Sequence, residues 1–64
     1  MSPLAEEISA TIYREMEAEL TNGTIIYETE FGFRAEVPHE LHDVIYLDNE
    51  NLDDLLDEIY EELN

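Results

Sequence analysis

The sequence predicts an α+β fold with the order α-β-β-β-α, in which two helices pack on one face of a small three-stranded antiparallel sheet. Three observations lead to this fold class. Apolar residues recur at helical spacing near both ends of the chain, the middle is rich in β-branched and aromatic residues around one glycine, and a short apolar run follows Pro38. Elements that are each apolar on one face bury those faces against one another, which gives two layers.

The first helix is expected to begin at Ser2 and Pro3 and to end at Asn22-Gly23. Serine suits the N-cap and proline the first helical position, while glycine can adopt the left-handed conformation of a C-cap. One side of this segment is apolar with a repeat of four residues. The residues of this stripe are Leu4, Ile8, Ile12, Met16 and Leu20.

Residues 24–37 are expected to form a β-hairpin with a three-residue loop at residues 30–32, in which Gly32 takes the left-handed position. A two-residue loop at Phe31-Gly32 is less favourable, because it would place glutamates beside apolar residues of the second strand. The expected pairs on the buried face are Thr29 with Phe33, Tyr27 with Ala35 and Ile25 with Val37. The expected pairs on the outer face are Glu28 with Arg34 and Ile26 with Glu36.

Pro38 ends the second strand, and residues 38–47 fit two structures. Leu41, Val44 and Ile45 have helical spacing, whereas the short β-branched run at residues 44–47 favours a third strand, which we predict. Residues 48–51 form a polar loop, and Asn51 lies three residues before Asp54, as a helix cap would. The last helix then has an apolar face made of Leu52, Leu55, Leu56, Ile59 and Leu63.

Composition indicates one acidic domain, residues 1–64. The chain has 18 Asp and Glu residues against Arg14 and Arg34 alone, which gives a net charge of −16. Charge repulsion destabilises so short a chain, but 44% apolar residues in periodic patterns argue against disorder. The sequence shows no signal peptide and no apolar run of spanning length, so we expect a soluble, cytoplasmic monomer.

The partner is expected to be a basic protein. Nucleic acid and anionic membranes would both repel this chain, so neither is expected to bind it directly. The expected binding residues are two columns of acids in the last helix and the acidic outer face of the hairpin. Phe31, at the tip of the hairpin, is expected either to fold back onto the protein, which we favour, or to insert into a partner. The helical acids are Asp53, Asp54, Asp57, Glu58, Glu61 and Glu62, and those of the hairpin are Glu28, Glu30 and Glu36.

The helical columns rank first because they oppose the stability of their own helix. Like charges four residues apart repel, and acids in the last turn face the negative end of the helix dipole. An ordinary solvated face is the alternative, but such a face normally mixes both signs. The net charge of −16 spread over an expected diameter of about 28 Å is also close to the linear charge density of duplex DNA, about one charge per 1.7 Å.

Catalysis, metals and cofactors are not expected. His39 and His42 stand three residues apart, whereas the zinc-protease pattern needs four. The acids around residue 50 lack the glycine and the ligand spacing of a calcium loop. Without cysteine or lysine, nucleophilic catalysis has no credible centre, so we expect a protein that is not an enzyme.

In its overall character the chain resembles the small acidic nucleic-acid mimics of phages, in particular anti-CRISPR proteins. The acids from Asp53 to Glu62 and the glutamates of the hairpin carry this likeness. It implies an inhibitor that fills the DNA-binding surface of a Cas protein in a type I Cascade complex, of the I-C kind as the first expectation. An antitoxin or immunity protein that caps a basic toxin is the alternative, and a small acidic subunit of an assembly is a third.

Overall fold

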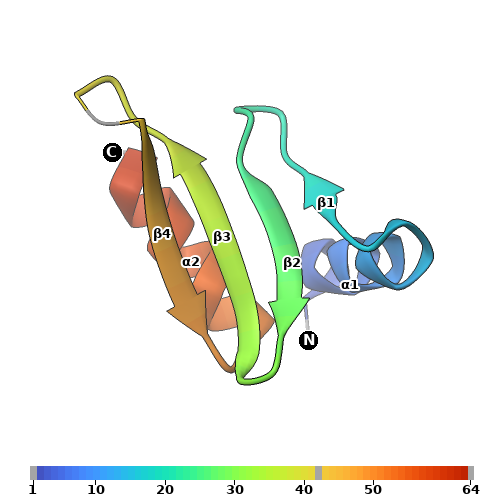
Figure 1. The fold of residues 1–64 in the computed structure, drawn as a ribbon. Coiled ribbons are helices and arrows are strands. Elements are labelled where there is room, and N and C mark those ends of the chain that lie inside the picture. The colour runs from blue at the N-terminus through green and yellow to red at the C-terminus, as the bar shows by residue number, and fades with distance from the viewer. Residues whose placement is uncertain (1, 42, 64) are drawn as a thin grey trace.

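The computed structural model describes residues 2–41 and 43–63, which contain two helices and four strands (Figure 1). In chain order the elements are α1 (Pro3–Glu15), β1 (Ala18–Glu19), β2 (Ile25–Thr29), β3 (Gly32–Pro38), β4 (Val44–Asn49) and α2 (Leu52–Leu63). Neither helix of the described ranges has the length and apolar character that crossing a bilayer requires.

The strands form one antiparallel sheet in the order β1-β2-β3-β4. Helix α1 packs on β1 and β2, and α2 packs on β3 and β4. Both contribute to a single core on one side of the sheet, so the other side is left open (Figure 1). The predicted α+β class is confirmed. The predicted count of three strands is wrong, because β1 adds a fourth at the edge.

The start of α1 follows the prediction, but its end does not. Ser2 is the N-cap, and its hydroxyl accepts a hydrogen bond from the Ala5 N–H at 3.2 Å. The helix ends at Glu15, where Met16 takes a left-handed conformation with φ of 74°. A repeat of four residues advances about 40° beyond each full turn, so the predicted apolar stripe drifts around the helix. Ile12 is therefore buried, whereas Met16 is 80% exposed.

The segment after Met16 forms an edge strand instead of more helix. Ala18 is buried opposite Ile26, while the next residue is exposed, as the alternation of a strand requires. The Asn22-Gly23 pair turns the chain between β1 and β2 and does not cap a helix. Its asparagine Oδ1 accepts the Thr24 N–H at 3.1 Å, and Gly23 has φ of 90°.

The predicted register of the β2–β3 hairpin is wrong by one residue. The turn has two residues, Glu30 and Phe31, and Thr29 lies opposite Gly32. The core decides this register, because it places Ile26 inside, where it is fully buried. The predicted pairing would have turned Ile26 to the outer face.

Glycine is needed at position 32 for a different reason from the one predicted. Its φ of 140° is one that L side chains rarely adopt, and a Cβ there would lie 2.5 Å from the Glu50 Cα. Glycine is therefore required because the hairpin tip approaches the β4–α2 connection closely. The hairpin tip consequently lies beside the start of α2.

The last two elements confirm the predicted strand and the final helix, but β4 extends to Asn49, two residues into the predicted polar loop, and Leu63 of the predicted apolar face is 49% exposed. Strand β4 includes the predicted run at residues 44–47, and α2 begins after Asn51, whose Oδ1 accepts the Asp54 N–H at 3.1 Å. The chain has a radius of gyration of 11.0 Å and a longest extent of 31 Å. The buried apolar residues of α2 are Leu52, Leu55, Leu56 and Ile59.

One polar group interrupts the core. The Thr24 side chain, one residue before β2, is fully buried, and its hydroxyl has no hydrogen-bond partner in the described part of the chain. A buried hydroxyl without a partner destabilises the folded state.

Replacing Thr24 with valine should therefore stabilise the protein. Thr24→Val keeps the shape and removes the hydroxyl, so the free energy of unfolding measured in urea should rise by roughly 1 kcal/mol. Thr21→Val is the matched control at an exposed position, where we expect a change within about 0.5 kcal/mol. A less stable Thr24→Val variant would show that the hydroxyl is satisfied in solution.

Candidate functional site

Six carboxylates occupy the side of α2 that faces away from the sheet. The opposite side is the buried apolar stripe, so a helical period of about 100° per residue places the acids on the remaining half of the helix. From first to last they span about 13 Å at about 1.5 Å of rise per residue. We call this set the α2 acidic face: Asp53, Asp54, Asp57, Glu58, Glu61 and Glu62.

The six side chains differ in accessibility. Those at the centre of the face and at its C-terminal end are exposed, whereas Asp53 and Glu58 are half-buried on the two flanks of the helix. The exposed members are Asp54, Asp57, Glu61 and Glu62. Four carboxylates are therefore directly available to a partner, and the two on the flanks are partly covered by neighbouring residues.

Asp53 joins α2 to the start of α1. Its Oδ1 accepts the Ser2 hydroxyl at 2.7 Å and the Ser2 N–H at 3.2 Å. These hydrogen bonds, that from the hydroxyl most of all, lower the pKa of the Asp53 carboxyl because they stabilise its ionised form. Ser2 therefore caps α1 and holds α2 at the same time, and Asp53 has a structural role within the face.

Glu58 lies on the opposite flank, toward β4, since the Asp53 flank faces α1. One of its carboxylate oxygens, Oε2, is buried and has no hydrogen-bond partner among the described residues. A buried polar oxygen without a hydrogen bond destabilises the folded state of the isolated protein.

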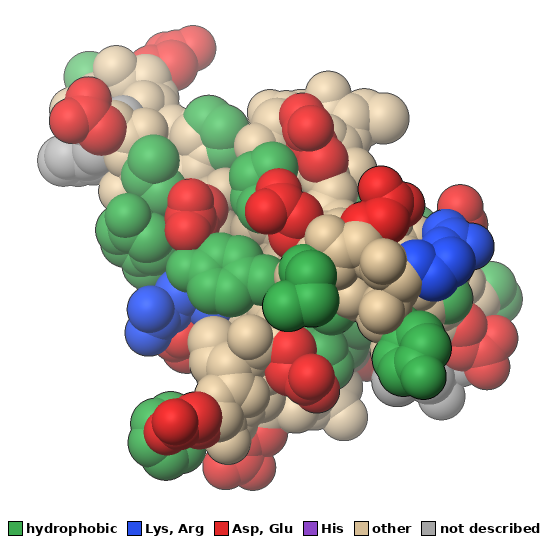
Figure 2. Space-filling view, turned by 45° about the vertical axis from the view of Figure 1, so that its right-hand side comes forward, with side chains coloured by type: hydrophobic (Ala, Val, Ile, Leu, Met, Phe, Trp, Pro, Cys, Tyr) green, Lys and Arg blue, Asp and Glu red, His purple; other side chains and the backbone are tan. Residues whose placement is uncertain are grey.

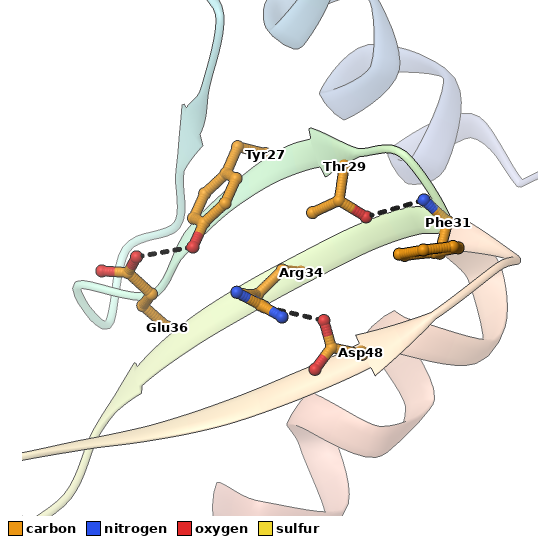
Figure 3. A network of polar contacts seen from close by, with 6 residues as sticks. All are labelled: Tyr27, Thr29, Phe31, Arg34, Glu36 and Asp48. Atoms are coloured by element: carbon orange, nitrogen blue, oxygen red, sulfur yellow. Dashed lines mark hydrogen bonds and ion pairs between the residues drawn. The ribbon is translucent and has the colours of Figure 1, made fainter.

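Neither arginine neutralises the α2 acidic face. Arg34 lies on the open face of the sheet and donates from Nε to Asp48 at 2.7 Å (Figure 3). It does not pair with Glu28 as predicted. Arg14 is in the last turn of α1, and the last turn of α2 contains no basic residue. Figure 2 draws the open face of the sheet with the α1 side turned forward, and on that side basic side chains lie toward opposite margins with acidic ones spread between them.

The predicted acidic surface of the hairpin does not form a single face. Glu36 lies on the open face, where it accepts the Tyr27 hydroxyl at 2.8 Å (Figure 3). This bond raises the pKa of Tyr27. Glu28 lies on the opposite, helix-covered face of the sheet, together with Ile26, and Glu30 is in the turn. The shift of one residue in register separates the three glutamates.

Phe31 is exposed at the hairpin tip. Its N–H donates to the Thr29 Oγ1 at 3.2 Å, and its side chain is 82% exposed (Figure 3). The folded-back conformation that we favoured from the sequence is therefore wrong. Phe31 lines an open depression of about 460 Å³ together with Glu30 and Glu50, next to the start of α2.

In residues 2–41 and 43–63, no three His, Asp or Glu side chains come together as a metal site would require. Of the two histidines considered in the sequence, His42 lies outside the described residues.

Sequence reasoning missed the exposed tyrosine of β4 and the buried oxygen of Glu58. Tyr46 is 59% exposed on the open face and lies opposite Glu36 on the neighbouring strand. Residues 44–47 are all apolar, so no alternation of polarity in the sequence marked which of them face solvent. No sequence signal marked Glu58, because its burial depends on how α2 lies across the sheet.

The Ser2–Asp53 contact should make stability depend on pH. A lowered pKa in the folded state contributes stability above the pKa of the unfolded chain, about 4, which is lost as pH falls through the folded value. Asp57→Asn removes the same charge from an exposed position and is the matched control. In urea titrations Asp53→Asn should be less stable than Asp57→Asn at pH 6, and the gap should narrow as pH falls below about 4, the pKa of an ordinary aspartate. A gap that does not change with pH would contradict this role of Asp53.

Comparison with known proteins adds no relative. No protein-family model, no curated protein and no solved structure matches this chain. The case for a function therefore rests on the side chains described above.

Proposed function

We propose that this protein is an inhibitor that occupies a basic nucleic-acid-binding groove of a partner protein in place of nucleic acid. The α2 acidic face is its main contact. Among possible targets, the resemblance of the sequence to small acidic anti-CRISPR proteins favours a Cas protein of a type I Cascade complex, met in the cytoplasm of the infected cell.

The observation that carries the proposal is the set of exposed carboxylates on α2 without a neighbouring arginine. Their spacing suits a phosphate-binding surface. Six carboxylates over about 13 Å give about one charge per 2.2 Å of helix axis, between the values of about 1.7 Å for duplex DNA and about 3.4 Å for one of its strands. A groove built to bind phosphates could therefore accept the helix.

The charge of the whole molecule points the same way. The net charge of −16 over the longest extent of 31 Å is about one charge per 1.9 Å, against about 1.7 Å in duplex DNA. A field of this strength steers the chain toward basic surfaces and speeds association with them.

The arrangement also works against the stability of α2, which supports a role in binding. Four like-charged pairs lie four residues apart, each costing a few tenths of a kcal/mol. Glu61 and Glu62 face the negative end of the helix dipole. Residues that oppose local stability without compensation are expected at functional sites. The pairs are Asp53 with Asp57, Asp57 with Glu61, Asp54 with Glu58 and Glu58 with Glu62.

Phe31 is the natural second contact. It lies on the hairpin tip beside the start of α2, and Glu30 and Glu50 share its depression. An exposed aromatic ring next to carboxylates suits a basic groove, because an aromatic anchor contributes apolar contact and can stack on arginine.

Reversing charge on α2 should abolish inhibition. The triple variant Asp54→Lys, Asp57→Lys and Glu61→Lys should lose at least roughly a hundredfold in affinity for the partner, measured by calorimetry, and should remain folded by circular dichroism. The control reverses the exposed Glu15, Glu17 and Glu40, which changes the net charge equally. Equal loss in both triples would mean that only net charge matters, and no loss in the α2 triple would exclude this face.

Salt should act on binding and on folding in opposite directions. Raising salt from about 50 to 200 mM should weaken binding steeply and should raise the melting temperature, because it screens both the contact and the self-repulsion.

The protein should also compete with DNA for the partner in fluorescence-anisotropy titrations. A ternary complex of partner, DNA and this protein would contradict mimicry and favour an inhibitor that binds elsewhere, such as one that caps a toxin.

A further inference from the structure

The sheet has an unprotected edge at β4. Within residues 2–41 and 43–63 this strand pairs only with β3, and it has six residues, whereas the opposite edge strand β1 has two. Proteins usually protect a long edge strand with lysine, proline or a bulge, because its free backbone groups can pair with another chain. The sequence of β4, Val-Ile-Tyr-Leu-Asp-Asn, contains neither lysine nor proline.

The side of β4 that faces the helices is incompletely covered. Ile45 and Leu47 pack against the core but are only partly buried. Helix α2 crosses behind β4, and its C-terminal end emerges beyond the free edge in Figure 1. A strand added to this edge would lie about 4.8 Å from β4. The overhanging part of α2 would then cover one face of the added strand, at the usual spacing of about 10 Å between layers.

The overhanging flank of α2 is acidic. It carries Glu58 and Glu62, since the flank with Asp53 faces α1. The buried Oε2 of Glu58 has no partner in the described part of the chain, so a hydrogen-bond donor is missing on this flank. The edge therefore combines free backbone groups, uncovered apolar side chains and an unsatisfied carboxylate.

We propose that β4 accepts an extended segment of a basic protein as a fifth strand. Lysine or arginine at alternate positions of that segment face α2. Their aliphatic stems cover Ile45 and Leu47, and their charged ends reach Glu58. The intervening residues are apolar and lie beside Val44 and Tyr46 on the open face. This inference rests on the proposed function only for the basic character of the partner.

A second copy of the chain does not suit this edge. Its own β4 would bring Asp48 and no basic side chain, and each copy carries a net charge of −16. The complement of the edge is a cationic strand, and charge therefore selects a basic partner over self-association.

The test uses a peptide of roughly eight residues that alternates lysine and valine, within the usual length of a strand. With saturating peptide, amide hydrogen exchange followed by NMR should slow by at least roughly tenfold in Val44–Asn49 and stay unchanged in Ala18–Glu19. The control peptide has the same charge but proline in place of valine, so it cannot form a strand. Equal protection by both peptides, or no protection of β4, would overturn the proposal.

A second measurement isolates the carboxylate. Glu58→Gln should weaken binding of the lysine-valine peptide by roughly tenfold, while Glu15→Gln, with the same change in charge, should alter it by less than about twofold. Equal effects would overturn the role of Glu58. Protection of β4 at high protein concentration without peptide, together with a dimer in sedimentation, would assign the edge to a second copy instead.

The two proposals fail separately. If β4 binds the peptide but charge reversal at Asp54, Asp57 and Glu61 leaves inhibition intact, strand addition at β4 is supported and mimicry through α2 is wrong. If those reversals abolish inhibition and β4 gains no protection, mimicry stands and the edge proposal is wrong.

Discussion

Burial of one apolar layer between the sheet and two helices has to offset the mutual repulsion of 16 net negative charges. The layer is small, because only one face of the sheet contributes to it. Ile26 of β2 and Ala35 of β3 are fully buried in it on the sheet side, where α1 packs on β2 and α2 packs on β3. Carboxylates can accumulate only where they do not enter this layer. The outer side of α2 meets that condition, so the dense acidic surface and the core are two sides of the same helix.

Some polar side-chain contacts of the described residues join two elements, although most are local. The Ser2–Asp53 bond joins the two helices, and the Arg34–Asp48 pair joins β3 to β4 on the open face. An exposed ion pair contributes little stability, typically below about 1 kcal/mol, so Arg34 orders the sheet surface more than it stabilises the fold. Most carboxylates thus remain available for intermolecular contacts.

The elements that sequence could predict were those with an internal pattern. The apolar face of α2, its cap at Asn51 and the β-branched run of β4 each lie within one element, and the structure confirms them except for Leu63, which is exposed at the end of the helix. The end of α1 and the register of the hairpin could not be predicted in this way. Met16 continues a repeat of four that drifts around a helix, and Ile26 is drawn inside by partners distant in sequence.

The candidate site divides in the same manner. Sequence alone determined the excess of acid and its concentration on one side of the last helix, because these follow from composition and helical period. Only the tertiary structure decided which acids are available, since it ties Asp53 to Ser2, buries an oxygen of Glu58 and separates the hairpin glutamates. It also decided that β4 is an open edge, because strand order depends on contacts across the whole chain.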